Sequence, residues 1–93
     1  MQVLVYAAQG FPREPLEHAL GRLRRKHPEL RIVSAFRLGA EQLVGLWGIT
    51  VGVPIEFRAV DTVPRGDAAV SFNDPDNAAR ARAAGLPVWE IRS

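Results

Sequence analysis

Apolar and polar residues along the chain fall into blocks that predict strands and helices in alternation. Residues 2–8 (QVLVYAA) form an almost continuous apolar run, which is typical of a central parallel strand covered on both faces. Shorter apolar segments predict four more strands, at residues 31–35, 54–60, 68–72 and 87–91. The chain is therefore expected to build a sheet from five strands.

Two of the three helices expected between these strands have clear ends. The first begins near Pro15, a residue that a first helical turn tolerates, and ends before Pro28. Its inward face is predicted to hold three leucines at helical spacing, Leu16, Leu20 and Leu23. The last helix is expected to start with Asp74 as N-cap and Pro75 at its first position, and to stop at Gly85.

The middle helix is predicted over residues 39–51. Its inward stripe is expected to consist of four residues, Leu43, Leu46, Trp47 and Thr50. Gly45 and Gly48 each lower the helix propensity by roughly 1 kcal/mol. Glycines kept inside a helix at that cost indicate close packing against a neighbouring element.

This order of elements predicts an α/β protein with a small Rossmann-like three-layer fold. The elements run β-α-β-α-β-β-α-β, and the five-stranded sheet is expected to be mostly parallel with strand order 3-2-1-4-5. One crossover helix is missing, because residues 61–66 (DTVPRG) are too few to form it. Either the third strand runs antiparallel to the fourth, or this short segment crosses one end of the sheet without a helix.

The missing helix predicts that part of one sheet face lacks a cover. The strands there are apolar on both sides, and an exposed apolar patch of several hundred square ångströms is usually a partner surface. We therefore expect binding of another protein, or of a second copy in a homodimer, with Phe57, Val60 and Val63 near the rim of that patch.

Composition narrows the possible functions. Ninety-three residues with 47% hydrophobic and 24% charged side chains predict one globular domain, and the absence of cysteine excludes disulfides and thiolate metal sites. No His, Asp or Glu spacing suggests a metal, so neither metal nor cofactor is predicted. Without a basic leader or an apolar run near 18 residues, we expect a cytoplasmic protein that does not enter membranes.

The net charge of +2 and the pI of about 9.9 raise the question of nucleic-acid binding. The densest basic run, residues 22–27, ends the first predicted helix, whose start carries Glu14 and Glu17. Acid at the start and base at the end of a helix complement its dipole, and few aromatic residues accompany the basic ones. Nucleic-acid binding is therefore disfavoured.

Three segments together carry a family resemblance: the run from Gly39 to Pro54, the strand from Asp67 to Phe72, and the ending AARARAAGLPVWEI. With the order of elements, they resemble the SLOG superfamily, specifically its DUF2493 or YspA-like branch, whose relatives include the Rossmann-like DprA and LOG proteins. The resemblance spans nearly the whole chain, in a degenerate and shortened form. It implies a nucleotide-binding ancestry.

The phosphate-handling residues of that family are largely replaced. A Gly-Ser-Arg-Asp signature would follow the first strand, where this chain has residues 7–10 (AAQG), and Gly-x-x-Gly-Ala-Asp would stand at residues 36–41 (FRLGAE). Phe36 in a glycine position is expected to fill the pocket. Asp74 and Asp76 are expected to cap the last helix and to repel a phosphate there.

Two functions follow from these expectations. The first is a non-catalytic protein-interaction module that binds and modulates a partner, with an accessory protein of a phage or mobile element as a plausible setting. The alternative is a sensor or scavenger of a nucleotide-derived small molecule, bound where the strands end. Six residues would line that crevice, with Arg37 as the anion contact: Gln9, Gly10, Arg37, Gly39, Glu41 and Asn73.

Overall fold

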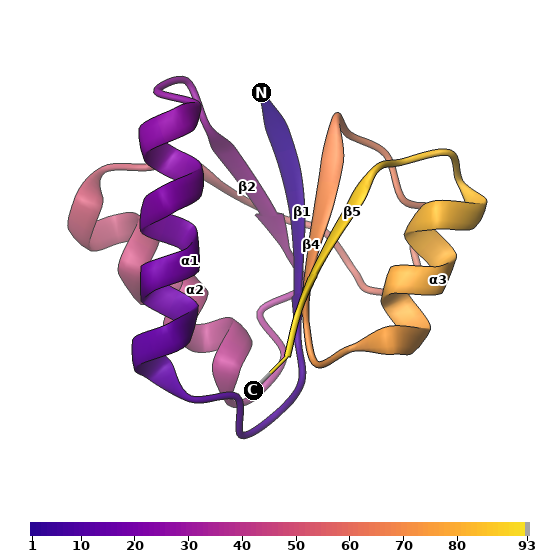
Figure 1. Cartoon of the computed structure of the whole chain (residues 1–93), viewed down its shortest axis with the longest axis horizontal. Coiled ribbons are helices and arrows are strands. Elements are labelled where there is room, and N and C mark those ends of the chain that lie inside the picture. The colour runs from indigo at the N-terminus through magenta and orange to yellow at the C-terminus, as the bar shows by residue number, and fades with distance from the viewer. Residues whose placement is uncertain (93) are drawn as a thin grey trace.

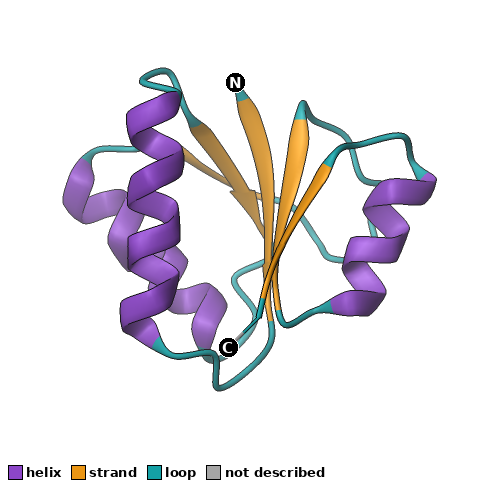
Figure 2. Cartoon of the chain, viewed as in Figure 1, coloured by secondary structure: helices purple, strands orange, loops and turns teal. Residues whose placement is uncertain are grey.

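The computed structural model describes residues 1–92 and has three layers, with the sheet in the middle (Figure 1). Helices α1 (Arg13–Lys26) and α2 (Ala40–Val51) cover one face of the sheet, and helix α3 (Pro75–Ala83) lies on the other. Figure 2 shows a long loop segment beside α3 on that second face. None of the helices within residues 1–92 has the length and apolar character needed to cross a membrane.

All five strands run parallel in one sheet of order β3-β2-β1-β4-β5. Their bounds are β1 (Gln2–Ala7), β2 (Arg31–Ser34), β3 (Ile55–Phe57), β4 (Ala68–Phe72) and β5 (Val88–Ile91). The predicted α/β class, Rossmann-like fold and strand order are confirmed. The sheet is wholly rather than mostly parallel, and β3 is shorter than the predicted strand because the chain leaves the sheet after three residues.

Local signals placed α3 correctly. Asp74 is its N-cap and accepts a hydrogen bond from the Asn77 backbone N–H, while Pro75 occupies the first position, where its missing N–H has no cost. Gly85 follows the helix at a φ of 87°, a conformation that glycine adopts without strain. The N-terminal strand β1 is likewise as apolar and as buried as its sequence predicts.

Helix α2 is rotated relative to the predicted stripe. Its buried residues are Ala40, Glu41, Val44, Trp47 and Gly48. The prediction that Leu46 and Thr50 face inward was therefore wrong. Small residues let the helix lie close to the sheet: a Cβ on Gly48 would come within 2.1 Å of the Ile55 Cδ1 atom of β3. That close approach turns the bulkier flank of α2 outward.

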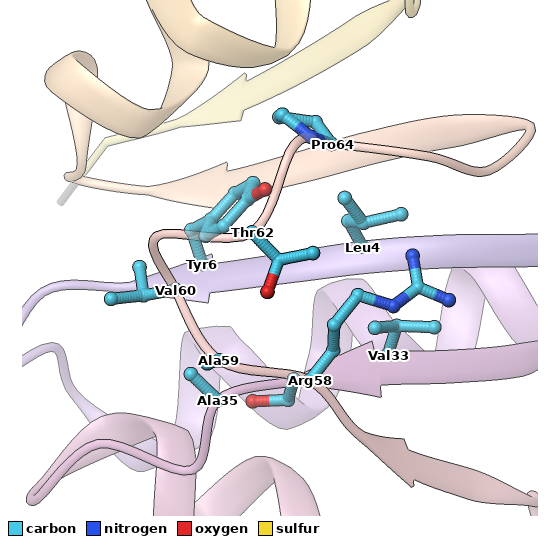
Figure 3. A pocket seen from close by; sticks show the side chains of 10 residues that line it. Leu4, Tyr6, Val33, Ala35, Arg58, Ala59, Val60, Thr62 and Pro64 are labelled. Carbon is cyan, nitrogen blue, oxygen red and sulfur yellow. The ribbon is translucent and has the colours of Figure 1, made fainter.

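The connection from β3 to β4 crosses the sheet without a helix, and both strands remain parallel to their neighbours. Figure 3 shows this segment, residues 58–67, lying over β1 and β2. Leu4, Tyr6 and Val33 are buried beneath it, and Val60 packs against them. The prediction of an uncovered face was wrong, because the short segment itself covers the apolar residues.

Cationic side chains hold this covering segment in place. The Arg80 guanidinium of α3 donates to the Val60 carbonyl at 2.5 Å and to the Thr62 carbonyl at 3.1 Å. Arg58 donates to the Arg65 carbonyl at 2.8 Å. The space left between segment and sheet is only about 10 Å³, roughly room for one water molecule.

The three residues predicted at the rim of a partner surface do not share one surface. Val60 is half-buried against the sheet, and Val63 is exposed on the covering segment. Phe57 lies at the β3 edge and stacks on Phe36, with ring centroids 6.2 Å apart. The surface as predicted therefore does not form, because the segment between β3 and β4 folds over the sheet.

Candidate functional site

The carboxyl ends of the central strands converge on the buried carboxylate of Glu41. This side chain is fully buried at the start of α2. One oxygen accepts the backbone N–H of Ala7, at the end of β1, at 3.0 Å, and the other accepts the backbone N–H of Arg37 at 2.9 Å. The backbone N–H groups of Ala7 and Arg37, which could otherwise face a ligand at this edge, are therefore bonded to the protein's own carboxylate.

Arg37 connects two loops across the end of the sheet. Its Nε donates to Glu41 at 3.0 Å, and its Nη2 contacts both Glu41 and Asp74, the latter at 2.7 Å. Glu41 follows β2 in the chain and Asp74 follows β4, so one guanidinium joins both sides of β1. The hydrogen bond to Glu41, reinforced by that to Asp74, raises the pKa of Arg37 above its ordinary value despite partial burial.

Asp74 has two roles, as helix cap and as partner of Arg37. Its side chain accepts from the Asn77 backbone N–H at 3.4 Å and from Asn77 Nδ2 at 2.9 Å. Burial alone would raise the pKa of Asp74, but the hydrogen bonds from Arg37 and Asn77 outweigh it and lower that pKa. The predicted capping role is confirmed, and the ion pair with Arg37 adds to it.

The other predicted crevice residues surround this network. A Cβ on Gly39 would lie 2.9 Å from Gln9 Cγ, so these two residues touch, and Gly39 has a φ of 92° that favours glycine. Gly10 and Asn73 lie in exposed turns with positive φ, and the Asn73 backbone N–H donates to Ile91 of β5. Close packing and turn geometry account for both glycines.

Phe36 does not fill the crevice, which corrects the prediction. Its backbone has a φ of 52°, and its ring lies over Gly45 of α2, 3.4 Å from where a Cβ would stand. The ring is thus directed toward the outer flank of α2 and toward Phe57. Glu41 fills the space at the strand ends instead.

A second feature, which we call the α2–β3 surface, lies on that outer flank. It is an open groove of about 690 Å³ between helix and edge strand. It is lined by Phe36, Gln42, Gly45, Leu46, Ile49, Val53 and Ile55, and the Phe57 ring adjoins it. Ile49 is 79% exposed, Phe57 66% and Leu46 59%, and none of the lining residues is charged.

The sequence did not predict this surface. The apolar residues of α2 were assigned to the core by their spacing, although the helix presents several of them to solvent. A usable signal was present: the only charged residue between Ala40 and Val51 is Glu41, so any exposed flank of that helix had to be uncharged.

Within residues 1–92, no cluster of three or more His, Asp or Glu side chains could hold a metal ion. No protein-family model, curated protein or solved structure matches the chain. The resemblance to the SLOG superfamily therefore stays a prediction, and the site has to be interpreted from its own geometry.

The lowered pKa of Asp74 predicts a specific loss of stability in acid. A carboxylate whose pKa is lower in the folded than in the unfolded chain stabilises the fold above its unfolded pKa, which is near 3.8. That stabilisation disappears as the pH falls through the folded value. At pH 7, Asp74→Asn should lower the free energy of unfolding by about 1–2 kcal/mol, and the difference from the wild type should shrink below pH 4.

Urea unfolding of both proteins between pH 7 and pH 2.5 measures this difference. Asparagine keeps the N-cap, so the substitution isolates the charge. Asp76→Asn, at an exposed position in the first turn of α3, is the matched control and should change stability by less than about 0.5 kcal/mol. A deficit of Asp74→Asn that stays constant down to pH 2.5 would contradict the assigned ion pair.

Proposed function

We propose that this protein is a non-catalytic protein-interaction module that binds through the α2–β3 surface. The observation that supports the proposal is the exposure of Leu46, Ile49 and Phe57 around an uncharged groove. Large contiguous apolar patches are uncommon on monomeric proteins, and where they occur they often mark surfaces that a partner covers. An apolar protein surface is the partner chemistry that fits.

The strand-end crevice gives less support to the alternative, a sensor of a nucleotide-derived ligand. A phosphate brought to Arg37 would meet the carboxylates of Glu41 and Asp74 at hydrogen-bonding distance from the same guanidinium. Its charge would be repelled by both, and Glu41 already accepts the N–H groups of Ala7 and Arg37. Arg37 is better explained as the link between the two loops.

Affinity capture from the native cell tests the proposal with three versions of the intact chain: wild type, Ile49→Asp and Val63→Asp. Ile49 and Val63 are both well exposed, so neither substitution should disturb folding, which circular dichroism checks. We expect Ile49→Asp to capture at least tenfold less partner protein than the wild type, because a carboxylate would be buried against an apolar surface. Val63→Asp, on the covering segment, should retain it.

Equal capture by wild type and Ile49→Asp would contradict the proposal. Loss with Val63→Asp alone would assign binding to the opposite face of the sheet. A panel of nucleotides in a thermal-shift measurement addresses the alternative function, since a saturable rise in melting temperature would favour a ligand over a protein partner.

A further inference from the structure

We propose that the partner seated on the α2–β3 surface is a second copy of this chain, joined by antiparallel pairing of β3 with β3 around a twofold axis at Phe57. The inference rests on the proposed function and names its partner. Three features of the surface support it: the free strand edge, the arrangement of charges along it, and the uncharged flank of α2.

Strand β3 is an edge strand with backbone groups available for pairing. Among the described residues 1–92, it lies at one end of the sheet and pairs only with β2. Ile32 donates to the Pro54 carbonyl and Arg58 donates to the Ser34 carbonyl, so even-numbered residues face β2. Because the direction alternates along a strand, the N–H and C=O groups of Ile55 and Phe57 point away from the sheet. Such an edge is a template for another strand.

Two charged residues select the register: Glu56 of β3, and Arg58, which follows the strand and still donates its N–H to the Ser34 carbonyl of β2. With Phe57 on the twofold axis, Glu56 of one copy stands opposite Arg58 of the other, in the closer, non-hydrogen-bonded kind of antiparallel pair. With Glu56 on the axis, two glutamates would face each other, which is unfavourable. Among registers that pair the outward backbone groups, the one centred on Phe57 brings opposite charges together.

The existing ion pair fits this arrangement. Arg58 Nη2 lies 2.8 Å from Glu56 Oε2 within one chain, and the Glu56 side chain is 55% exposed. Two copies in the proposed register would combine these into a network of two carboxylates and two guanidinium groups. Networks of alternating charge are more favourable than isolated surface pairs.

The same twofold axis brings the two α2 helices together. An axis perpendicular to the sheet keeps α2 of both copies on one face, beside the joined strands. Leu46 and Ile49 lie three positions apart on one flank of α2, and both side chains are exposed there. With no charged residue in the groove, self-apposition brings no like charges together.

Light scattering coupled to size exclusion measures the state of the purified chain. Between micromolar and millimolar concentration we expect a mass that rises toward twice the 10.2 kDa of one chain. Ile49→Asp should raise the apparent dissociation constant at least tenfold, whereas Val63→Asp, also well exposed but on the covering segment, should leave it unchanged. A wild-type chain that stays monomeric up to millimolar concentration would overturn the proposal.

Disulfide trapping tests the register, because the chain contains no cysteine of its own. In an antiparallel hydrogen-bonded pair the Cα atoms lie about 5.5 Å apart, within the range that a disulfide spans. Under mild oxidation Phe57→Cys should give a covalent dimer at least tenfold faster than Val63→Cys, the collision control. Equal rates, or faster trapping of Glu56→Cys than of Phe57→Cys, would overturn the proposed pairing.

The two proposals fail in different ways. If the purified chain is monomeric but Ile49→Asp abolishes capture of a cellular protein, the interaction module stands and the second copy is wrong. If Ile49→Asp changes neither mass nor capture, both are wrong.

Discussion

Replacing Glu41 with alanine is expected to lower the free energy of unfolding by about 3–5 kcal/mol, because two backbone N–H groups lose their acceptor, at roughly 1–3 kcal/mol each, and Arg37 loses one of its two carboxylates. The carboxylate is fully buried and is the partner of the Arg37 guanidinium. Its removal also leaves the Ala7 N–H without its acceptor. Urea unfolding at pH 7 measures the loss, which is large for a domain of this size.

The chain supplies a matched control in a second Arg-Glu pair with the same spacing. Arg13 and Glu17 are also four residues apart, with 2.7 Å between Nε and Oε2, but both side chains are substantially exposed. Glu17→Ala should therefore cost less than about 1 kcal/mol. Equal losses from Glu41→Ala and Glu17→Ala would show that burial does not strengthen the strand-end network as inferred.

Glu41→Gln separates charge from shape. Glutamine keeps the volume of the side chain and can still accept the Ala7 N–H. If Glu41→Gln lowers the free energy of unfolding much less than Glu41→Ala does, most of the loss in the alanine variant comes from missing hydrogen bonds. A cost near that of alanine would assign it to the lost charge beside Arg37, whose guanidinium would keep only Asp74 as its ionic partner.

The elements that the sequence predicted well are those whose signals are local. The Asp74-Pro75 start and Gly85 stop of α3 depend on backbone geometry within a few residues, and they agree with the structure. The parallel strand order follows from the alternation of strands and helices and from the handedness of crossovers. Neither inference needs knowledge of distant contacts.

The inward face of α2 could not be predicted, because its closest contacts use residues with little hydrophobic signal. Gly48 is buried against Ile55 of another element, while Leu46, with a stronger apolar signal, remains outside. A periodicity based on hydrophobicity weights the leucine and ignores the glycine.

The candidate site was predicted in part. Arg37 and Glu41 were both placed at the strand ends, where the structure brings them together. The bond between Arg37 and Glu41, and the ion pair of Arg37 with Asp74, were missed, because an acidic residue at a helix start is usually an exposed cap. Arg37 and Asp74 are 37 residues apart in the chain, so their ion pair is visible only in the folded structure.

Replacing Arg80 with alanine is the second substitution for which we expect a large effect, a loss of about 2–3 kcal/mol in the free energy of unfolding. Its guanidinium donates to the carbonyls of Val60 and Thr62 and to Asn77 Oδ1. Without it, those carbonyls lose a cationic donor, and the segment of residues 58–67 loses its link to α3.

The consequence of Arg80→Ala should be local as well as global, because segment 58–67 is the cover over Leu4 and Tyr6. Hydrogen exchange at the backbone amides of that segment should accelerate at least tenfold, since opening no longer breaks the bonds to Arg80. Arg82→Ala is the control on the same helix: Arg82 is half-exposed and pairs with Glu90, so it should cost less than about 1 kcal/mol. If exchange in residues 58–67 were the same in both variants, the segment would be held by its own apolar contacts, and Arg80 would be dispensable for covering the sheet.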